Sequence, residues 1–167
     1  MRGVHRRWLA LAALTFVVAS LAACSSSHAD AISIPTATTG TVQVTVDRTS
    51  YTVSRAIGVT VSNSANKTDY YARTGKSVCT YIQLEEYNAS KNAWLPVDGC
   101  QTAGQSSVLL IPHASSIPYT LAPQSRANQN QWDPGTYRIA LEYATDSTAT
   151  SGIQIAYSAG FTISAAG

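Results

Sequence analysis

Few side chains in this sequence are spaced for catalysis. His113 is the only histidine beyond residue 28, and it stands in Pro112-His113-Ala114-Ser115-Ser116. A hydrolase needs a nucleophile beside a base and an orienting group, but the sequence has no glycine-framed serine elbow. Glu85 and Glu86 adjoin on a predicted strand, so they point to opposite faces and cannot work as a pair. The residues therefore predict a protein that is not an enzyme, with a hydrolase using His113 as a distant alternative.

Metal and cofactor chemistry find equally little support. The three histidines, His5, His28 and His113, lie far apart, and none stands in ligand spacing with a cysteine. A copper site would need a cluster of histidine with cysteine or methionine, yet Met1 is the only methionine. No glycine-rich loop that could cradle a phosphate occurs. We expect neither a metal nor a cofactor.

The N-terminus carries the most specific pattern in the chain. Three arginines precede an uncharged apolar run over residues 8–23, which is typical of an export signal and is short for a membrane span of about 20 residues. The run ends in Leu21-Ala22-Ala23-Cys24, which resembles the lipobox of bacterial lipoproteins. The resemblance implies cleavage before Cys24 and a diacylglycerol thioether on its sulfur. It predicts a signal peptide over 1–23 and a lipid anchor on the extracytoplasmic face of a cell membrane; the alternative is an ordinary secretory signal.

Removal of the signal changes the charge of the protein. Three of its eleven basic residues leave with the signal, so eight remain against nine acidic residues. A nearly neutral chain has no basic stripe that could hold nucleic acid. Nucleic acid is therefore not an expected partner.

Two further cysteines fit an oxidising compartment. With Cys24 lipidated, Cys79 and Cys100 form an even pair, and we expect them to be bonded. A closed loop of about 20 residues would contribute on the order of 3 kcal/mol in the chain-entropy model. The alternative is two buried free thiols.

The rest of the sequence predicts strands. Residues 24–40 have no sustained apolar period and indicate a flexible tether, so the domain is expected over 41–167. Apolar residues alternate with a period of two near residues 42–46, 57–61, 79–87, 117–121 and 137–143, and shorter apolar runs lie at 94–97 and 108–111. In the last run, Ile153, Ile155, Tyr157, Phe161 and Ile163 are expected on a single face, with Ala159-Gly160 as a bulge. The pattern predicts an all-β antiparallel sandwich of seven to nine strands.

Three stretches are similar to the bacterial immunoglobulin-like domains of small exported lipoproteins. They are the segment from Tyr51 to Asn63, the hairpin from Leu84 to Trp94, and Leu121-Ala122-Pro123 followed by Pro134-Gly135-Thr136-Tyr137-Arg138. The resemblance implies an immunoglobulin-like fold over about residues 41–164, with Tyr137 packed at a sandwich corner. Cys79 and Cys100 depart from the antibody pattern, because they flank a hairpin and do not join two sheets.

Aromatic residues near predicted loops are the candidate ligand contacts. Rings of this kind stack on sugars or anchor protein contacts, and the candidates are Tyr70, Tyr71, Trp94 and Trp132. The alternative is that the tryptophans cover the ends of the sandwich and the tyrosines cap its core. The sequence predicts a membrane-anchored binding or scaffolding module whose partner is an unidentified envelope protein or glycan. A proteinase inhibitor acting through an exposed loop at 101–107 or 124–131, and a carbohydrate-binding module, are the alternatives.

Overall fold

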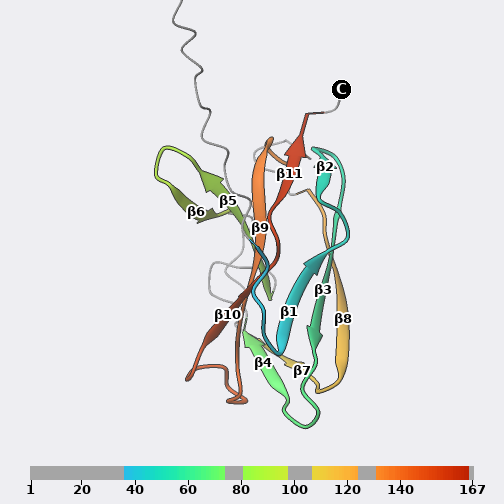
Figure 1. Cartoon of the computed structure of the whole chain (residues 1–167), viewed down its shortest axis with the longest axis vertical. Helices are drawn as coiled ribbons and strands as arrows, with labels where there is room; N and C mark the ends of the chain where they lie inside the picture. The colour runs from blue at the N-terminus through green and yellow to red at the C-terminus, as the bar shows by residue number, and fades with distance from the viewer. Residues whose placement is uncertain (1–35, 74–80, 98–106, 124–130, 166–167) are drawn as a thin grey trace, which may run out of the picture. The chain divides into compact units, whose positions relative to one another are not determined.

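A computed structural model describes residues 36–73, 81–97, 107–123 and 131–165. The chain divides into two compact units, Met1–Ile32 and Ser33–Gly167, and all described residues belong to the second. That unit is all-β in its described part, as predicted. Its strands are β1 Val42–Val46, β2 Ser50–Thr52, β3 Ile57–Asn63, β4 Tyr70–Arg73, β5 Ile82–Asn88, β6 Ala93–Pro96, β7 Val108–Ile111, β8 Ser115–Leu121, β9 Gly135–Ala144, β10 Gln154–Tyr157 and β11 Phe161–Ser164 (Figure 1).

The strands form two sheets. The first has the order β1-β3-β8, and the second has the order β2-β11-β9-β4-β7, with β5 and β10 also paired to β9 and with β6 on β5. All pairs are antiparallel except β2 with β11, which is parallel. The order β1-β3-β8 against β11-β9-β5-β6 agrees with an immunoglobulin-like sandwich. Strand β7 departs from that plan, because it pairs with β4 and not with β8.

The eleven strands exceed the predicted seven to nine. Strand β2 lies outside the stretches in which alternation was noted, and β4 lies where Tyr70 and Tyr71 were placed near a loop. The predicted final strand is divided into β10 and β11. Segments of three and four residues hold at most two cycles of alternation, so their periodicity is a weak indication of a strand.

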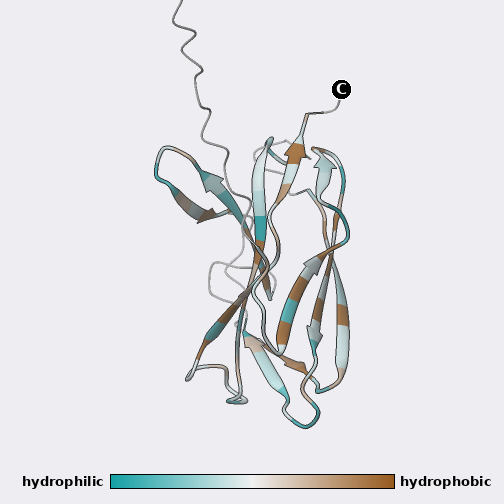
Figure 2. Cartoon of the chain, in the orientation of Figure 1, coloured by the Kyte–Doolittle hydropathy of each residue, from teal (hydrophilic) through white to brown (hydrophobic). Residues whose placement is uncertain are grey.

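The core follows the predicted alternation closely in the longer strands. Every second residue of β3, from Ile57 to Asn63, is buried, and Val42 and Val44 of β1 are buried opposite it. The alternation of apolar and polar residues along β1 is visible in Figure 2. In β9, four side chains share the buried face as predicted, namely Tyr137, Ile139, Leu141 and Tyr143.

Tyr137 occupies the predicted corner. Its side chain is 2% exposed, and its hydroxyl donates a hydrogen bond to the carbonyl oxygen of Asp133 at 2.7 Å. The ring packs over Gly135, where a Cβ atom would lie 3.1 Å from the ring carbon Cε2. The arrangement matches the tyrosine corner of immunoglobulin-like sandwiches. The prediction that Tyr137 packs at a corner of the sandwich is confirmed.

The prediction of one apolar face over the final run is wrong. Tyr157 pairs with Ala140, but Phe161 pairs with Tyr137, so three residues of the final run lie opposite two of β9. The extra residue is a bulge, and a shift of one residue exchanges the two faces of a strand. Phe161 and Ile163 therefore face the core, whereas Ile153 and Ile155 are exposed.

Ser158 holds the bulge in place. Its side chain is fully buried, and its backbone N–H donates to the carbonyl oxygen of Ile139 at 2.9 Å. In return, the N–H of Ile139 donates to the Ser158 hydroxyl oxygen at 2.9 Å. The Ser158 hydroxyl oxygen thus accepts the Ile139 N–H in place of a backbone carbonyl oxygen, which the bulge moves out of reach.

Candidate contact surface

The predicted site residues do not come together. Cys24, Cys79 and Cys100 lie outside the described residues. The hairpin β5–β6 does lie between Cys79 and Cys100 in the sequence, as predicted. The two candidate inhibitory loops lie almost wholly outside the described residues.

Trp132 is part of the fold and not a displayed contact. Its side chain is 8% exposed, and its indole N–H donates to the carbonyl oxygen of Arg55 at 2.8 Å. Its backbone N–H donates to the carbonyl oxygen of Val53 at 2.8 Å. Trp132 is therefore tied to the chain that follows β2, in agreement with the alternative that it covers the core.

The two candidate tyrosines are in β4 and point to opposite sides of the sheet. The ring of Tyr70 packs edge-on against Tyr143, with ring centroids 5.3 Å apart, and lies against the core. Tyr71 pairs with Leu110 of β7 and with Ala144 of β9 on the outer side. Of the two, Tyr71 belongs to the surface.

Trp94 belongs to a set of stacked side chains that crosses the outer face of the larger sheet. The guanidinium carbon of Arg138, on β9, lies 4.6 Å from the centroid of the Trp94 ring and 3.8 Å from that of Tyr157. Tyr87 lies beside Trp94, with centroids 5.4 Å apart. Arginine on an aromatic face is attracted by the ring quadrupole. We call Arg138, Trp94, Tyr157 and Tyr87 the cation–π ladder; it ties β5, β6, β9 and β10 together.

The charge of the ladder is neutralised locally. The Arg138 Nε atom lies 2.7 Å from the Glu85 Oε2 atom, and both side chains are only 15% exposed. A shielded pair of this geometry is worth more than an exposed one, although its removal from water opposes the gain. The ladder therefore presents aromatic surface with no net charge.

The large apolar side chains that remain exposed gather on the same outer face. Among the described residues they are Val108, Leu110, Ile153 and Ile155, and each is between 42% and 51% exposed. Leu110 lies opposite Tyr71, and Ile155 lies opposite the exposed Glu142. Val108 lies two positions before Leu110 in β7, so it shares the face of Leu110. Ile153 directly precedes β10 and is the most exposed of the four. We call these four residues and Tyr71 the apolar row.

Sequence reasoning missed most of this surface. It named Trp94 and Tyr71, but it placed Ile153, Ile155 and Tyr157 on one face with Phe161 and Ile163. The Ala159-Gly160 pair could have indicated that Ile155 and Tyr157 face outward, because a bulge at this pair exchanges the faces of the strand before and after it.

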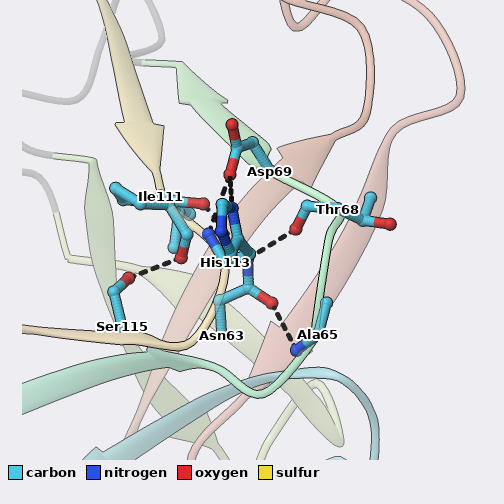
Figure 3. A network of polar contacts seen from close by, with 8 residues as sticks. Asn63, Ala65, Thr68, Asp69, Ile111, His113 and Ser115 are labelled. Atoms are coloured by element: carbon cyan, nitrogen blue, oxygen red, sulfur yellow. Dashed lines mark hydrogen bonds and ion pairs between the residues drawn. The ribbon is translucent and has the colours of Figure 1, made fainter.

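A second polar cluster joins two turns at the end of the sandwich where β3 and β7 end (Figure 3). The carboxylate oxygen Oδ1 of Asp69 accepts the backbone N–H of His113 at 2.8 Å and lies 2.8 Å from its ring atom Nδ1. These bonds hold the pKa of Asp69 below its ordinary value. The buried amide of Asn63 donates to the carbonyl oxygens of Thr68 and Ile111 and accepts the N–H of Ala65. The cluster fastens the turns 64–69 and 112–114 to each other.

The geometry of this cluster is structural. His113 is half exposed in its loop, and the hydroxyl of Ser115 donates to the carbonyl oxygen of Pro112. Asp69 and His113 thus resemble two members of a triad, but the hydrogen bonds of Ser115 are directed to the backbone. The arrangement supports turn closure and not nucleophilic chemistry.

Tyr87 and Trp94 do not make a flat sugar platform, because their ring planes are inclined by 57°. Within the described ranges no three histidine, cysteine or acidic side chains are grouped as metal ligands. The same part of the chain contains no helix long and apolar enough to cross a membrane.

Comparison with known proteins adds no assignment. No protein-family model matches the chain. No curated protein sequence is significantly similar to it.

Proposed function

We propose that the chain is an exported lipoprotein, anchored by lipid at Cys24, whose immunoglobulin-like domain is a non-enzymatic contact module of the cell envelope. The observation that carries the contact role is the outer face of the larger sheet, where the exposed large apolar side chains of the described residues gather beside the cation–π ladder. Contiguous apolar patches on a soluble domain mark interaction sites.

One feature of the sequence and one of the structure support the anchored part of the proposal. Leu21-Ala22-Ala23-Cys24 follows a charged and then apolar N-terminus, which is the order of a lipoprotein signal. The fold takes in the end of the predicted tether, because the N–H of Thr38 donates to the carbonyl oxygen of Tyr157 at 3.0 Å. A lipid on Cys24 would therefore hold the domain through β10, the strand that carries Ile155.

The anchored part is tested by detergent phase partition and by the intact mass of the protein. Wild type should enter the detergent phase with the mass of a chain cleaved before Cys24 and carrying a diacylglycerol. Cys24→Ser should stay uncleaved or enter the aqueous phase. Equal partition of both proteins, with no lipid mass on the wild type, would contradict the proposal.

The contact role is tested by photo-cross-linking in the native membrane. A photoreactive side chain at Leu110 or Ile155 should give adducts with an envelope component. The matched control is the same group at Thr45 or Thr120, which are exposed on β1 and β8 of the smaller sheet. Equal adduct yields on both sheets would show that the outer face of the larger sheet is not a contact surface.

A further inference from the structure

We infer that the envelope component contacted by the apolar row is the lipid surface itself, so that the domain lies with the outer face of its larger sheet against the membrane that holds its anchor. The inference rests on the proposed lipidation of Cys24. The proposed partner of the contact surface is the boundary between the headgroups and the acyl chains of a bilayer.

The first support is the arrangement of the apolar row across the sheet. Leu110, Tyr71 and Ala144 lie side by side on three neighbouring strands, and Ile155 lies on the fourth, beside Glu142. Neighbouring strands are about 4.8 Å apart, so three intervals give a width of about 14 Å. At this level the outward residues of β9 are the buried Ala144 and the exposed Glu142, so the exposed apolar side chains lie on both sides of β9. A spread of this width fits a flat boundary better than a single inserted side chain.

The second support is the charge balance of this face. Its strands direct four charged side chains to this face, of which Arg73 and Arg138 are basic and Glu85 and Glu142 are acidic, whereas Glu86 of β5 lies opposite Tyr137 on the other face. Net charge is therefore zero, and Arg138 is already paired with Glu85. Such a face is neither drawn to nor repelled by the headgroup charge, so its attraction to a bilayer comes from apolar burial.

The third support is the kind of aromatic residue beside the apolar row. Tyr71, Tyr87, Trp94 and Tyr157 combine an apolar ring with a polar group, and rings of this kind are enriched at the level of lipid headgroups. The cation–π ladder fixes three of them on the same face. The face thus places the three rings of the cation–π ladder at one end and, at the other, aliphatic side chains with Tyr71 among them.

The fourth support is the length of chain between the anchor and the fold. Thr38 is bonded to Tyr157 of β10, and the covalent chain from Cys24 to Thr38 spans at most about 50 Å. A link of this length keeps the domain at an effective concentration on the order of millimolar at the membrane surface, so the face would bind the membrane even if its affinity were weak. The anchor and the apolar row therefore reinforce each other.

The test uses the mature lipidated protein in phosphatidylcholine vesicles that contain a nitroxide-labelled lipid. Trp94→Phe removes the native surface indole and leaves the buried Trp132 as a constant background. In this protein, Ile155→Trp places an indole in the apolar row, and Thr120→Trp places one on the exposed side of β8 as the matched control. Unchanged thermal unfolding shows that each variant keeps the fold.

The indole introduced by Ile155→Trp should be quenched by the lipid nitroxide and shifted to shorter emission wavelength, because it enters the boundary by about 5 to 10 Å. The indole introduced by Thr120→Trp should be neither quenched nor shifted. Because the face carries no net charge, quenching should be the same in 0.1 M and 1 M salt and on phosphatidylglycerol vesicles.

The failures of the two proposals are distinguishable. If the protein floats with the vesicles but neither indole is quenched, the anchor is present and the membrane contact is refuted. A blue shift of the Ile155→Trp indole that occurs only in native membranes would assign the face to a protein partner and overturn the lipid contact. Equal quenching of both indoles would also overturn it, and a protein that does not float would refute the anchor and the inference together.

Discussion

Tyr137 permits a direct test of how the larger sheet is held to the core. Its ring stacks on Phe161, with centroids 6.1 Å apart, and its hydroxyl bonds to the carbonyl oxygen of Asp133. Two substitutions separate these contributions. Tyr137→Phe removes the hydroxyl and keeps the ring, whereas Tyr137→Ala removes both.

The structure sets the expected magnitudes. A hydrogen bond between neutral groups contributes about 0.5 to 1.5 kcal/mol net, so Tyr137→Phe should lower the free energy of unfolding by about that amount. Truncation of a fully buried aromatic side chain costs about 3 to 5 kcal/mol, which we expect for Tyr137→Ala. A domain has about 5 to 15 kcal/mol in total, so the alanine variant should be close to unfolding.

The assay is urea unfolding followed by circular dichroism, with the m-value compared between variants so that a change in midpoint reports stability. Thr120→Ala, at an exposed position of β8, is the neutral control. Trp132→Ala cannot serve as one, because Trp132 is buried and should also be strongly destabilising. An alanine variant of Tyr137 that unfolds at the wild-type midpoint would refute the buried corner. If Tyr137→Phe lowered the free energy of unfolding as much as Tyr137→Ala, the ring would not be the larger of the two contributions.

Three other outcomes are expected. The pKa of Asp69 is depressed below 3.8, first by the backbone N–H of His113 and then by the His113 ring, so the stability that Asp69 contributes is present above about pH 4 and is lost as pH falls through the lower folded-state pKa. Asp69→Asn should flatten the loss of urea midpoint between pH 4 and pH 2, whereas His113→Ala, which keeps the backbone N–H, should flatten it only in part. Gly58→Ala would place a Cβ atom 2.8 Å from the Cγ atom of Asp47, whose carboxylate accepts the Gly58 N–H. The substitution should lower the free energy of unfolding, and the loss should be smaller in an Asp47→Ala background. A double-mutant cycle in urea would measure the difference. The two cysteines that flank the β5–β6 hairpin should resist alkylation until the protein is reduced, as intact-mass measurement would reveal.

Local periodicity accounts for what could be predicted of the fold. The four inward side chains of β9 and those of β3 repeat every second residue for long enough to define a face. Ile155 was placed on the wrong side because a single extra residue near Ser158 reverses the faces, and the hydrogen bonds that hold this residue involve Ile139 of another strand. Such a register is set by tertiary pairing and not by the run itself.

The contact surface was harder to predict, because its members are distant in sequence. Trp94, Arg138 and Tyr157 come together only through the pairing of β5, β6, β9 and β10. Trp132 precedes a Pro-Gly turn, so composition indicated a loop, whereas its indole is bonded to Arg55 from the chain after β2. Burial of this kind depends on which distant segment lies beside a residue.

The parallel pairing of β2 with β11 bears on when the domain can fold. Ser50 lies opposite Thr162, so the first part of the domain needs its last strand as a partner. Phe161 of that strand also packs against Tyr51 and Tyr137. Contacts between such distant positions slow folding, because the long intervening loop must close first. A chain still lacking its last residues therefore lacks part of its core. Under the proposed export, β11 would have to cross the membrane before the domain could reach its native state.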